Sequence, residues 1–235
     1  MLANNSAVIQ TAIAPGAFIM ECKVPGTMAI TFDDGPYLYT DDLLDILSEY
    51  DVSATFFING KNIGRSLDRD KFKQKIVKRA YSEGHQIGSH TWSHRDLSVT
   101  KGAAREQQMT ELEDTLIDII GVKPTYMRPP YGSCDAQCMA HMANMGYRVI
   151  HWSLDTLDYG VRTVDEMTVV EESFEKKLPT NTEEPGPIVL AHDSLELTVY
   201  QLAVPMIEKS LEAGFQLVTV GECLGESRKL WYKRK

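Results

Sequence analysis

The sequence has no long apolar run and comparatively few basic residues. Along its 235 residues, no apolar stretch approaches the roughly 20 residues that a membrane-spanning helix needs. Lysine and arginine together number 24, against 33 aspartate and glutamate residues, and the formal net charge is −9. Because phosphate groups repel a negatively charged protein, we expect neither nucleic acid nor an anionic membrane as the main partner. The charge is compatible with a neutral or cationic substrate.

The N-terminal residues lack the features of a secretory signal peptide. No positively charged region precedes their apolar residues, which are interrupted by Asn4, Asn5, Gln10 and Thr11. We therefore expect residues 1–16 to be a mature N-terminus behind an added methionine. The length of the chain suits one sizeable domain, because α/β barrels commonly occupy about this length.

Cysteine is scarce, and its spacing argues against a structural zinc site. The four cysteines are Cys22, Cys134, Cys138 and Cys223, which do not form the two close pairs of such a site. Cys134 and Cys138 are four residues apart in a segment rich in turn residues and could close a small ring. Cys22 and Cys223 would then join the beginning of the domain to its end. This pairing favours disulfides and an oxidising compartment, whereas four buried thiols are the alternative.

Segments with strand and helix periodicity alternate along nearly the whole chain. Seven short apolar runs predict buried strands, near residues 28–30, 54–58, 85–90, 125–127, 148–152, 188–191 and 216–219. Helical spacing of apolar residues predicts six longer helices, near residues 40–50, 70–82, 100–120, 135–144, 165–177 and 198–213. Thr40 is expected to cap the first of these helices.

This alternation predicts an α/β fold with parallel strands joined by right-handed crossovers. An open doubly wound sheet and a barrel both satisfy it. The number of strands, and the polar residues that follow many of them, favour an irregular (β/α) barrel with about seven parallel strands. We expect the active site at the C-terminal ends of the strands, where such barrels place their functional side chains.

Two adjacent carboxylates, Asp33 and Asp34, follow the first predicted strand. Gly35 and Pro36 end this strand, because proline cannot continue a hydrogen-bonded ladder. Side chains alternate between the two faces of a strand, so the carboxylates can point in different directions and have different roles. Taken alone, the segment could equally be a solvated turn.

His90 and His94 are placed at the end of the third predicted strand and in the loop after it. On a helical turn, a spacing of four residues puts both imidazoles on one face, where they can bind one metal ion. Since Asp33 and Asp34 also follow a strand, we expect all four side chains at the same end of the sheet. Two imidazoles and one carboxylate form a common catalytic zinc site with open positions for water and substrate. The spacing does not show which aspartate would be the ligand.

Five short segments, taken in the order in which they occur along the chain, together form a recognisable pattern. They are residues 31–36 (TFDDGP), 89–94 (SHTWSH), 128–131 (RPPY), 155–159 (DTLDY) and 190–192 (LAH). In this order they resemble the motifs of the polysaccharide deacetylases, carbohydrate esterase family 4. The resemblance extends from about Cys22 to Tyr232, and the cysteine placement and residues 218–225 are similar to those of secreted fungal chitin deacetylases. It implies a catalytic domain over residues 22–225, an N-terminal extension over 1–21 and a C-terminal tail over 226–235.

The resemblance implies a metal-dependent hydrolase. Asp34, His90 and His94 would hold Zn²⁺, with Co²⁺ as the alternative metal. The implied reaction removes N-acetyl groups from chitin or chito-oligosaccharides and releases acetate. Alternatives with the same residues are an O-deacetylase of acetylxylan and a peptidoglycan deacetylase. An inactive carbohydrate-binding protein is a further alternative, although binding alone requires neither a general base nor a general acid.

The resemblance also implies a division of proton transfer between two residues. Asp33 would be the general base, and Arg128 its ion-pair partner. His192 would be the general acid, and Asp155 its partner. An arginine beside a carboxylate favours the ionised carboxylate, whereas an aspartate beside an imidazole favours the charged imidazolium. Such opposite effects suit one base and one acid near neutral pH.

The remaining residues implied by the resemblance contact the substrate. The backbone N–H of Tyr131 would stabilise the tetrahedral oxyanion. Tyr159 and Leu190 would line the pocket for the acetyl methyl group; Tyr159 occupies a position where the family often has tryptophan. We expect a monomer that is secreted or located in the cell wall.

Overall fold

A computed structural model describes residues 12–234, so the expectation for the first residues falls largely outside the described range. A single sheet forms most of the molecule, in the order β1-β8-β7-β5-β4-β3-β10-β2, with β11 paired to β3 and β9 paired to β10. A separate pair joins β6 and β12. The strands are β1 (Phe18–Ile19), β2 (Glu21–Pro25), β3 (Thr27–Asp33), β4 (Thr55–Ile58), β5 (Gln86–Ser89), β6 (Lys123–Pro124), β7 (Tyr126–Met127), β8 (Arg148–Ile150), β9 (Leu154–Asp155), β10 (Pro185–His192), β11 (Gln216–Leu217) and β12 (Tyr232–Lys233).

The predicted barrel is confirmed. All seven predicted strands are present, as β3, β4, β5, β7, β8, β10 and β11. Within the main sheet every pairing is parallel except that of β2 with β10. In the parallel pairing of β3 with β10, Asp33 is opposite His192. The C-terminal ends of neighbouring strands therefore meet at one edge, as parallel pairing requires.

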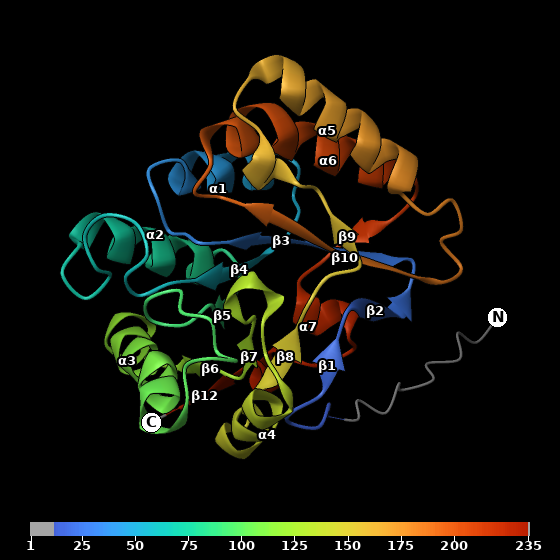
Figure 1. The fold of residues 1–235 in the computed structure, drawn as a ribbon. Helices are drawn as coiled ribbons and strands as arrows, with labels where there is room; N and C mark the ends of the chain where they lie inside the picture. The colour runs from blue at the N-terminus through green and yellow to red at the C-terminus, as the bar shows by residue number, and fades with distance from the viewer. Residues whose placement is uncertain (1–11, 235) are drawn as a thin grey trace.

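Helices surround the sheet (Figure 1). They are α1 (Thr40–Glu49), α2 (Lys71–Ser82), α3 (Gly102–Ile120), α4 (Ala136–Met145), α5 (Val164–Lys177), α6 (Ala203–Glu212) and the short α7 (Val220–Cys223). Figure 1 shows α1, α5 and α6 on one side of the sheet and α3 and α4 on the opposite side.

The prediction that Thr40 caps α1 is wrong: the N-cap is Tyr39, and no side chain caps the N-terminus of this helix. The hydroxyl of Thr40 bonds to Asp193 instead.

Every residue of β3, β4, β5, β7 and β8 is buried, so these strands are covered on both faces, as is typical of parallel sheets covered by helices. Along β3, Met28, Ile30 and Phe32 belong to a cluster packed against the helices, whereas Ala29 belongs to a second cluster. This second cluster gathers side chains from β1, β2, β3, β4, β7, β8 and β10. A third cluster contains Met127 of β7 and Val149 of β8, so successive residues of these strands also contribute to different cores.

Segments on either side of the predicted catalytic domain pack against the same cores. Strand β1 pairs with β8, and Trp231 is only 2% exposed. Both disulfides are present, joining Cys22 to Cys223 and Cys134 to Cys138. The described parts of residues 12–21 and 226–234 are thus integrated with the barrel, whereas the division of the chain at residues 22 and 225 stays a prediction.

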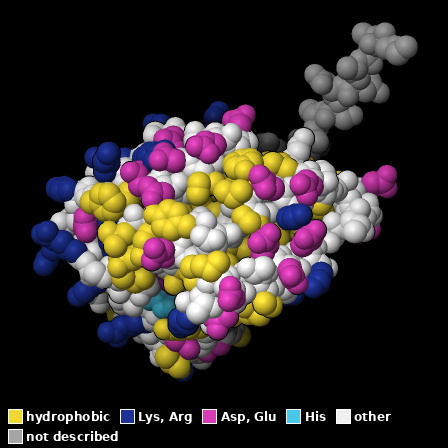
Figure 2. All heavy atoms as spheres, turned by 90° about the horizontal axis from the view of Figure 1, so that it is seen from above, with side chains coloured by type: hydrophobic (Ala, Val, Ile, Leu, Met, Phe, Trp, Pro, Cys, Tyr) yellow, Lys and Arg dark blue, Asp and Glu magenta, His cyan; other side chains and the backbone are white. Residues whose placement is uncertain are grey.

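The surface agrees with the acidic composition. On the face seen in Figure 2, acidic side chains are scattered among hydrophobic ones, and most basic side chains lie toward its edges. Between residues 12 and 234, no helix is both long and apolar enough to cross a membrane.

Candidate metal centre and active site

The site begins where β3 ends. Asp33 is the last residue of β3 and is buried, with 2% of its surface exposed. At Asp34 the chain leaves the strand with a φ of 75°, a left-handed conformation that is uncommon outside glycine. The change of backbone direction separates the two carboxylates. Asp33 bonds to Arg128 and Asp34 faces the imidazoles, so the two carboxylates point in different directions as predicted, but the cause is this turn and not alternation along the strand.

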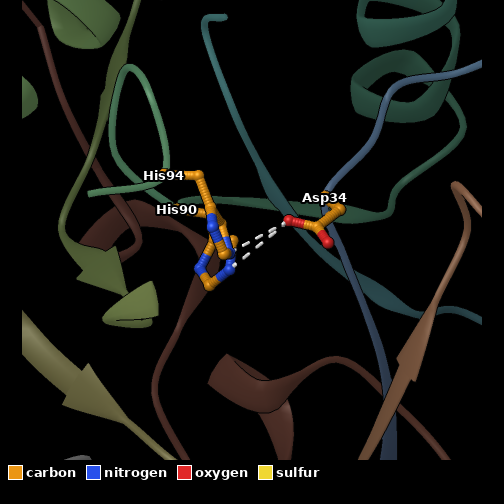
Figure 3. Close-up of side chains that lie close together, drawn as sticks. All are labelled: Asp34, His90 and His94. Atoms are coloured by element: carbon orange, nitrogen blue, oxygen red, sulfur yellow. Dashed lines mark ion pairs between the residues drawn. The ribbon is translucent and has the colours of Figure 1, made fainter. Parts of the chain in front are cut away.

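Asp34, His90 and His94 form a group that fits one metal ion (Figure 3). Their ligand atoms all lie within 4.8 Å of one another. Asp34 Oδ1 is 3.3 Å from His94 Nε2 and 3.8 Å from His90 Nε2. Figure 3 shows the carboxylate of Asp34 facing the two imidazoles across a gap. Among residues 12–234, this is the only group of at least three such side chains that meets this distance criterion.

The environment of His90 suits a metal ligand. Its Nδ1 donates a hydrogen bond to the carbonyl oxygen of Arg128 at 2.8 Å. This bond keeps the proton on Nδ1, so the lone pair of Nε2 points toward Asp34 and His94. Burial lowers the pKa of His90 to about 3, against the opposing charge of Asp34. The imidazole is therefore neutral at physiological pH, as ligation requires.

Asp33 is paired with Arg128, as the sequence predicted. Asp33 Oδ1 accepts a hydrogen bond from Arg128 Nη1 at 2.8 Å. The guanidinium is fully buried and is held in turn by Thr31 Oγ1 at 2.6 Å and by the carbonyl of His151 at 2.9 Å. We expected this pairing to keep Asp33 ionised. Complete burial instead raises the pKa of Asp33, although the charge of Arg128 opposes the rise.

The predicted pairing of His192 with Asp155 is wrong, because the partner is Asp158. His192 Nδ1 lies 2.8 Å from Asp158 Oδ1, and the His192 backbone N–H donates to Asp158 Oδ2 at 2.8 Å. Thr198 also donates to Oδ2 at 2.8 Å. Burial by itself would lower the pKa of His192, but the bond to Asp158 and the surrounding carboxylates raise it to about 9.

The backbone explains why His192 pairs with Asp158, the second aspartate of residues 155–159, and not with Asp155. In the pairing of β9 with β10, Asp155 is opposite Leu190, two residues before His192. At Leu157 the chain turns in a left-handed conformation, with a φ of 64°, and then brings Asp158 to His192. The carboxylate of Asp155 accepts bonds from Leu157 N at 2.9 Å and from the Tyr159 hydroxyl at 3.4 Å. The sequence does contain a signal for this pairing: Asp158 is a second aspartate, three residues after Asp155 and on the other side of a turn.

One cavity of about 420 Å³ unites these groups. Its lining comprises Asp33, Asp34, His90, His94, Pro129, Tyr131, Gly132, Trp152, Tyr159, Leu190 and His192. The predicted substrate-contacting residues Tyr131, Tyr159 and Leu190 are all included, whereas Asp155 is not. Tyr131 is 72% exposed at the rim, whereas Leu190 is 4% exposed. The cavity therefore has an open aromatic rim and an apolar wall beside its polar groups.

Three residues of this region were not found from the sequence. Trp152 lines the cavity, and the sequence analysis placed it only at the end of a strand. Asn62 Nδ2 donates to Asp34 Oδ1 at 2.9 Å, from a loop that carries no recognisable signal. Asp193 follows His192 and is fully buried.

Backbone conformation also marks the site. Among the described residues, six non-glycine residues have positive φ, and five of them belong to the segments that form the site. These five are Asp34, Thr91, His94, Tyr131 and Leu157. Such conformations cost free energy and persist where surrounding contacts hold them, most often at functional sites.

Comparisons with known proteins agree with this geometry. Residues 21–150 match the family model described as polysaccharide deacetylase. The chain is 44% identical over 224 residues to a chitin deacetylase of a Pestalotiopsis species, covering 95% of this chain and 72% of that protein. It is 39% identical over 233 residues to a chitin deacetylase of Colletotrichum lindemuthianum, covering 98% of this chain and 92% of that protein. The solved structure of the chitin deacetylase from that fungal pathogen matches with a TM-score of 0.91 and 40% identity, covering 94% of this chain and 97% of the other. The chain belongs to the polysaccharide deacetylase family.

Proposed function

We propose that this protein is a metal-dependent N-deacetylase of chitin or chito-oligosaccharides, producing acetate and free amino groups. The observation that carries the proposal is the convergence of three groups in one cavity. These are the Asp34–His90–His94 cluster, the Asp33–Arg128 pair and the His192–Asp158 pair. The similarity to two fungal chitin deacetylases over nearly the whole chain supports chitin as the substrate.

Asp34, His90 and His94 would hold the metal ion, for which we propose Zn²⁺, with Co²⁺ as a substitute. The donor set fits: two imidazole nitrogens and one carboxylate are a common catalytic zinc set, and the orientation of His90 leaves its Nε2 unprotonated. A bound Zn²⁺ supplies Lewis-acid polarisation of the acetyl carbonyl and lowers the pKa of water. Asn62, through its bond to Asp34, fixes the rotamer of the carboxylate.

Asp33 and His192 move the protons. Asp33 accepts a proton from the attacking water, because its raised pKa brings it closer to that of an effective base at neutral pH. Arg128 holds its carboxylate in place. His192 is protonated through its bond to Asp158 and donates a proton to the nitrogen of the leaving amine. An amine is a poor leaving group without that proton.

The remaining cavity residues orient the acetamido group. The backbone N–H of Tyr131 donates to the developing oxyanion. Tyr159, Leu190 and Trp152 form the wall against which the acetyl methyl group packs. Asp155 supports this wall rather than the acid, because it bonds to the hydroxyl of Tyr159.

The setting of the enzyme is part of the proposal. The two disulfides support a secreted or cell-wall location, where oxidising conditions maintain such bonds. The polysaccharide is the partner, and a monomer suffices because residues 12–234 of one chain supply every proposed catalytic group.

Acetate release from three substrates tests the proposal. The purified protein is incubated with a ladder of chito-oligosaccharides, with acetylxylan and with peptidoglycan fragments, and Asp33→Asn serves as the inactive control. The proposal predicts release from chito-oligosaccharides above release from the other two. Preferential release from acetylxylan or peptidoglycan would change the assigned substrate. Binding of chitin without acetate release in the presence of zinc would instead indicate a carbohydrate-binding protein.

A further inference from the structure

The carboxyl group of Asp193 is buried beside the turn that carries Asp34. Asp193 directly follows His192, and its side chain has no exposed surface. Its Oδ2 accepts a hydrogen bond from Thr40 Oγ1 at 2.6 Å, whereas its Oδ1 has no hydrogen-bond partner among residues 12–234. A buried polar atom without a partner costs free energy. Stability alone therefore does not account for a carboxyl group at this position.

The carboxyl group packs directly against Gly35. A Cβ atom on Gly35 would lie 2.0 Å from Asp193 Oδ2 and 2.5 Å from its Cγ. No real Cβ atom approaches other atoms so closely, so Gly35 is required here because Asp193 occupies the space of a side chain. Gly35 immediately follows Asp34, which has the left-handed conformation described above. Asp193 thus limits the positions that this turn can adopt.

Thr40 joins the other end of the same loop to Asp193. Its Oγ1 accepts a hydrogen bond from the Tyr37 backbone N–H at 2.9 Å and donates its own proton to Asp193. Residues 34–40 are therefore attached to the end of β10 at two points, by packing at Gly35 and by hydrogen bonding at Thr40. The parallel pairing of β10 with β3 places His192, the proposed acid, opposite Asp33.

We propose that Asp193 is a positioning residue that holds the Asp34 turn in the geometry needed for metal binding. The inference rests on the proposed metal site. This role requires two features of the side chain. One is an oxygen that accepts a hydrogen bond from Thr40, and the other is a planar group that occupies the space beside Gly35. Neither the hydrogen bond from Thr40 nor the packing against Gly35 requires a negative charge. An amide can meet both requirements.

Zinc titration of metal-stripped protein tests this role without relying on activity. Asp193→Ala removes both contacts and should weaken zinc affinity by roughly 10- to 100-fold, the range found when residues that support metal ligands are removed. Asp193→Asn should restore affinity close to the parent value. Thr40→Val should weaken zinc binding in the same direction, and it provides a second test if Asp193→Ala fails to fold. Ser194→Ala, at the buried next residue, is the matched control and should bind zinc as the parent does.

Two results would overturn the inference. Parent-like zinc affinity in Asp193→Ala, with or without lower thermal stability, would show a merely structural role. Equal loss in Asp193→Asn and Asp193→Ala would show that charge, and not the bridge to Thr40, matters. If the parent protein itself does not bind zinc, the proposed metal site fails, and the inference fails with it. That result is distinguishable because it appears in the parent.

Discussion

Asp33 and Asp34 are adjacent in the sequence but have separate tasks. The left-handed backbone at Asp34 turns its carboxylate toward His90 and His94, whereas Asp33 stays in line with β3 and bonds to Arg128. The separation allows one carboxylate to be changed while the other is preserved. It gives a direct test of the base at the level of one residue.

Asp33→Asn should lower the rate of acetate release by about 10²- to 10⁴-fold, the usual contribution of a positioned proton-transfer group. The amide keeps the shape of the side chain but cannot accept the proton of water. Zinc affinity should remain close to that of the parent, because Asp34 still provides the carboxylate ligand. Acetate assays and zinc titration measure the two effects. An active Asp33→Asn variant would exclude Asp33 as the base.

Asp158 should control the alkaline limb of the pH–rate profile. The reaction requires ionised Asp33 and protonated His192, so activity falls at low pH as Asp33 is protonated and at high pH as His192 loses its proton. Asp158 contributes to the rise of the His192 pKa to about 9. In Asp158→Asn the imidazolium loses its partner, so the alkaline limb should move downward, toward the ordinary histidine value of about 6.5.

Asp155→Asn is the matched control for this experiment. The carboxylate of Asp155 bonds to Leu157 and Tyr159. Its substitution should therefore leave the alkaline limb in place, even if it changes the KM through Tyr159. A shift of the limb in Asp155→Asn but not in Asp158→Asn would contradict the assignment of Asp158.

At the scale of elements, the segments with a clear apolar pattern were predictable and those without one were not. All seven predicted strands and six predicted longer helices are present within a few residues of the expected bounds. Strands β1, β2, β6, β9 and β12 were not expected. Four of them are two residues long and cannot display a periodic pattern, and β2, although five residues long, has three exposed residues and only one buried residue. Strands β7 and β11 are equally short but lie within longer apolar runs of the sequence. The partner of His192 was missed for a related reason, since it depends on a turn after β9, one of the unexpected strands.

Helix α5 offers a test of local stabilisation. Its N-terminus has a capping box, in which Thr163 Oγ1 accepts from Glu166 N at 3.3 Å and Glu166 Oε2 accepts from Thr163 N at 3.2 Å. Thr163→Ala should lower the free energy of unfolding by about 1 kcal/mol. Urea unfolding measures this change. Thr168→Ala, inside the same helix, should change stability by less than about 0.5 kcal/mol, and an equal loss there would contradict the capping argument.

At the scale of the whole molecule, the Cys22–Cys223 disulfide joins β2 to α7 across a separation of 201 residues. In the loop-closure model, a ring of this size contributes roughly 5 kcal/mol, and a short ring such as Cys134–Cys138 roughly 2 kcal/mol. The double variant Cys22→Ser/Cys223→Ser should therefore lose more stability than Cys134→Ser/Cys138→Ser. Denaturant unfolding of both variants measures which of them loses more free energy of unfolding. A larger loss from the short ring would contradict the argument.

The assembly of the site was predictable at this scale because parallel strands bring their C-terminal ends together. The residues of the metal cluster and the Asp33–Arg128 pair could be named from motifs that follow strands. Asn62, Trp152 and Asp193 could not, because their roles arise from contacts between segments that are distant in the sequence. Sequence patterns show where a strand ends, but not which loop residue then reaches a neighbouring ligand.

Removal and return of the metal is the measurement that tests the central claim most directly. The protein is stripped with a chelator, and acetate release from a chito-oligosaccharide is measured before and after addition of Zn²⁺ or Co²⁺. We predict that stripped protein releases no acetate and that either ion restores release. His90→Ala should regain little activity at the zinc concentration that restores the parent, because one imidazole ligand is missing. Full activity in the metal-free protein would contradict the account.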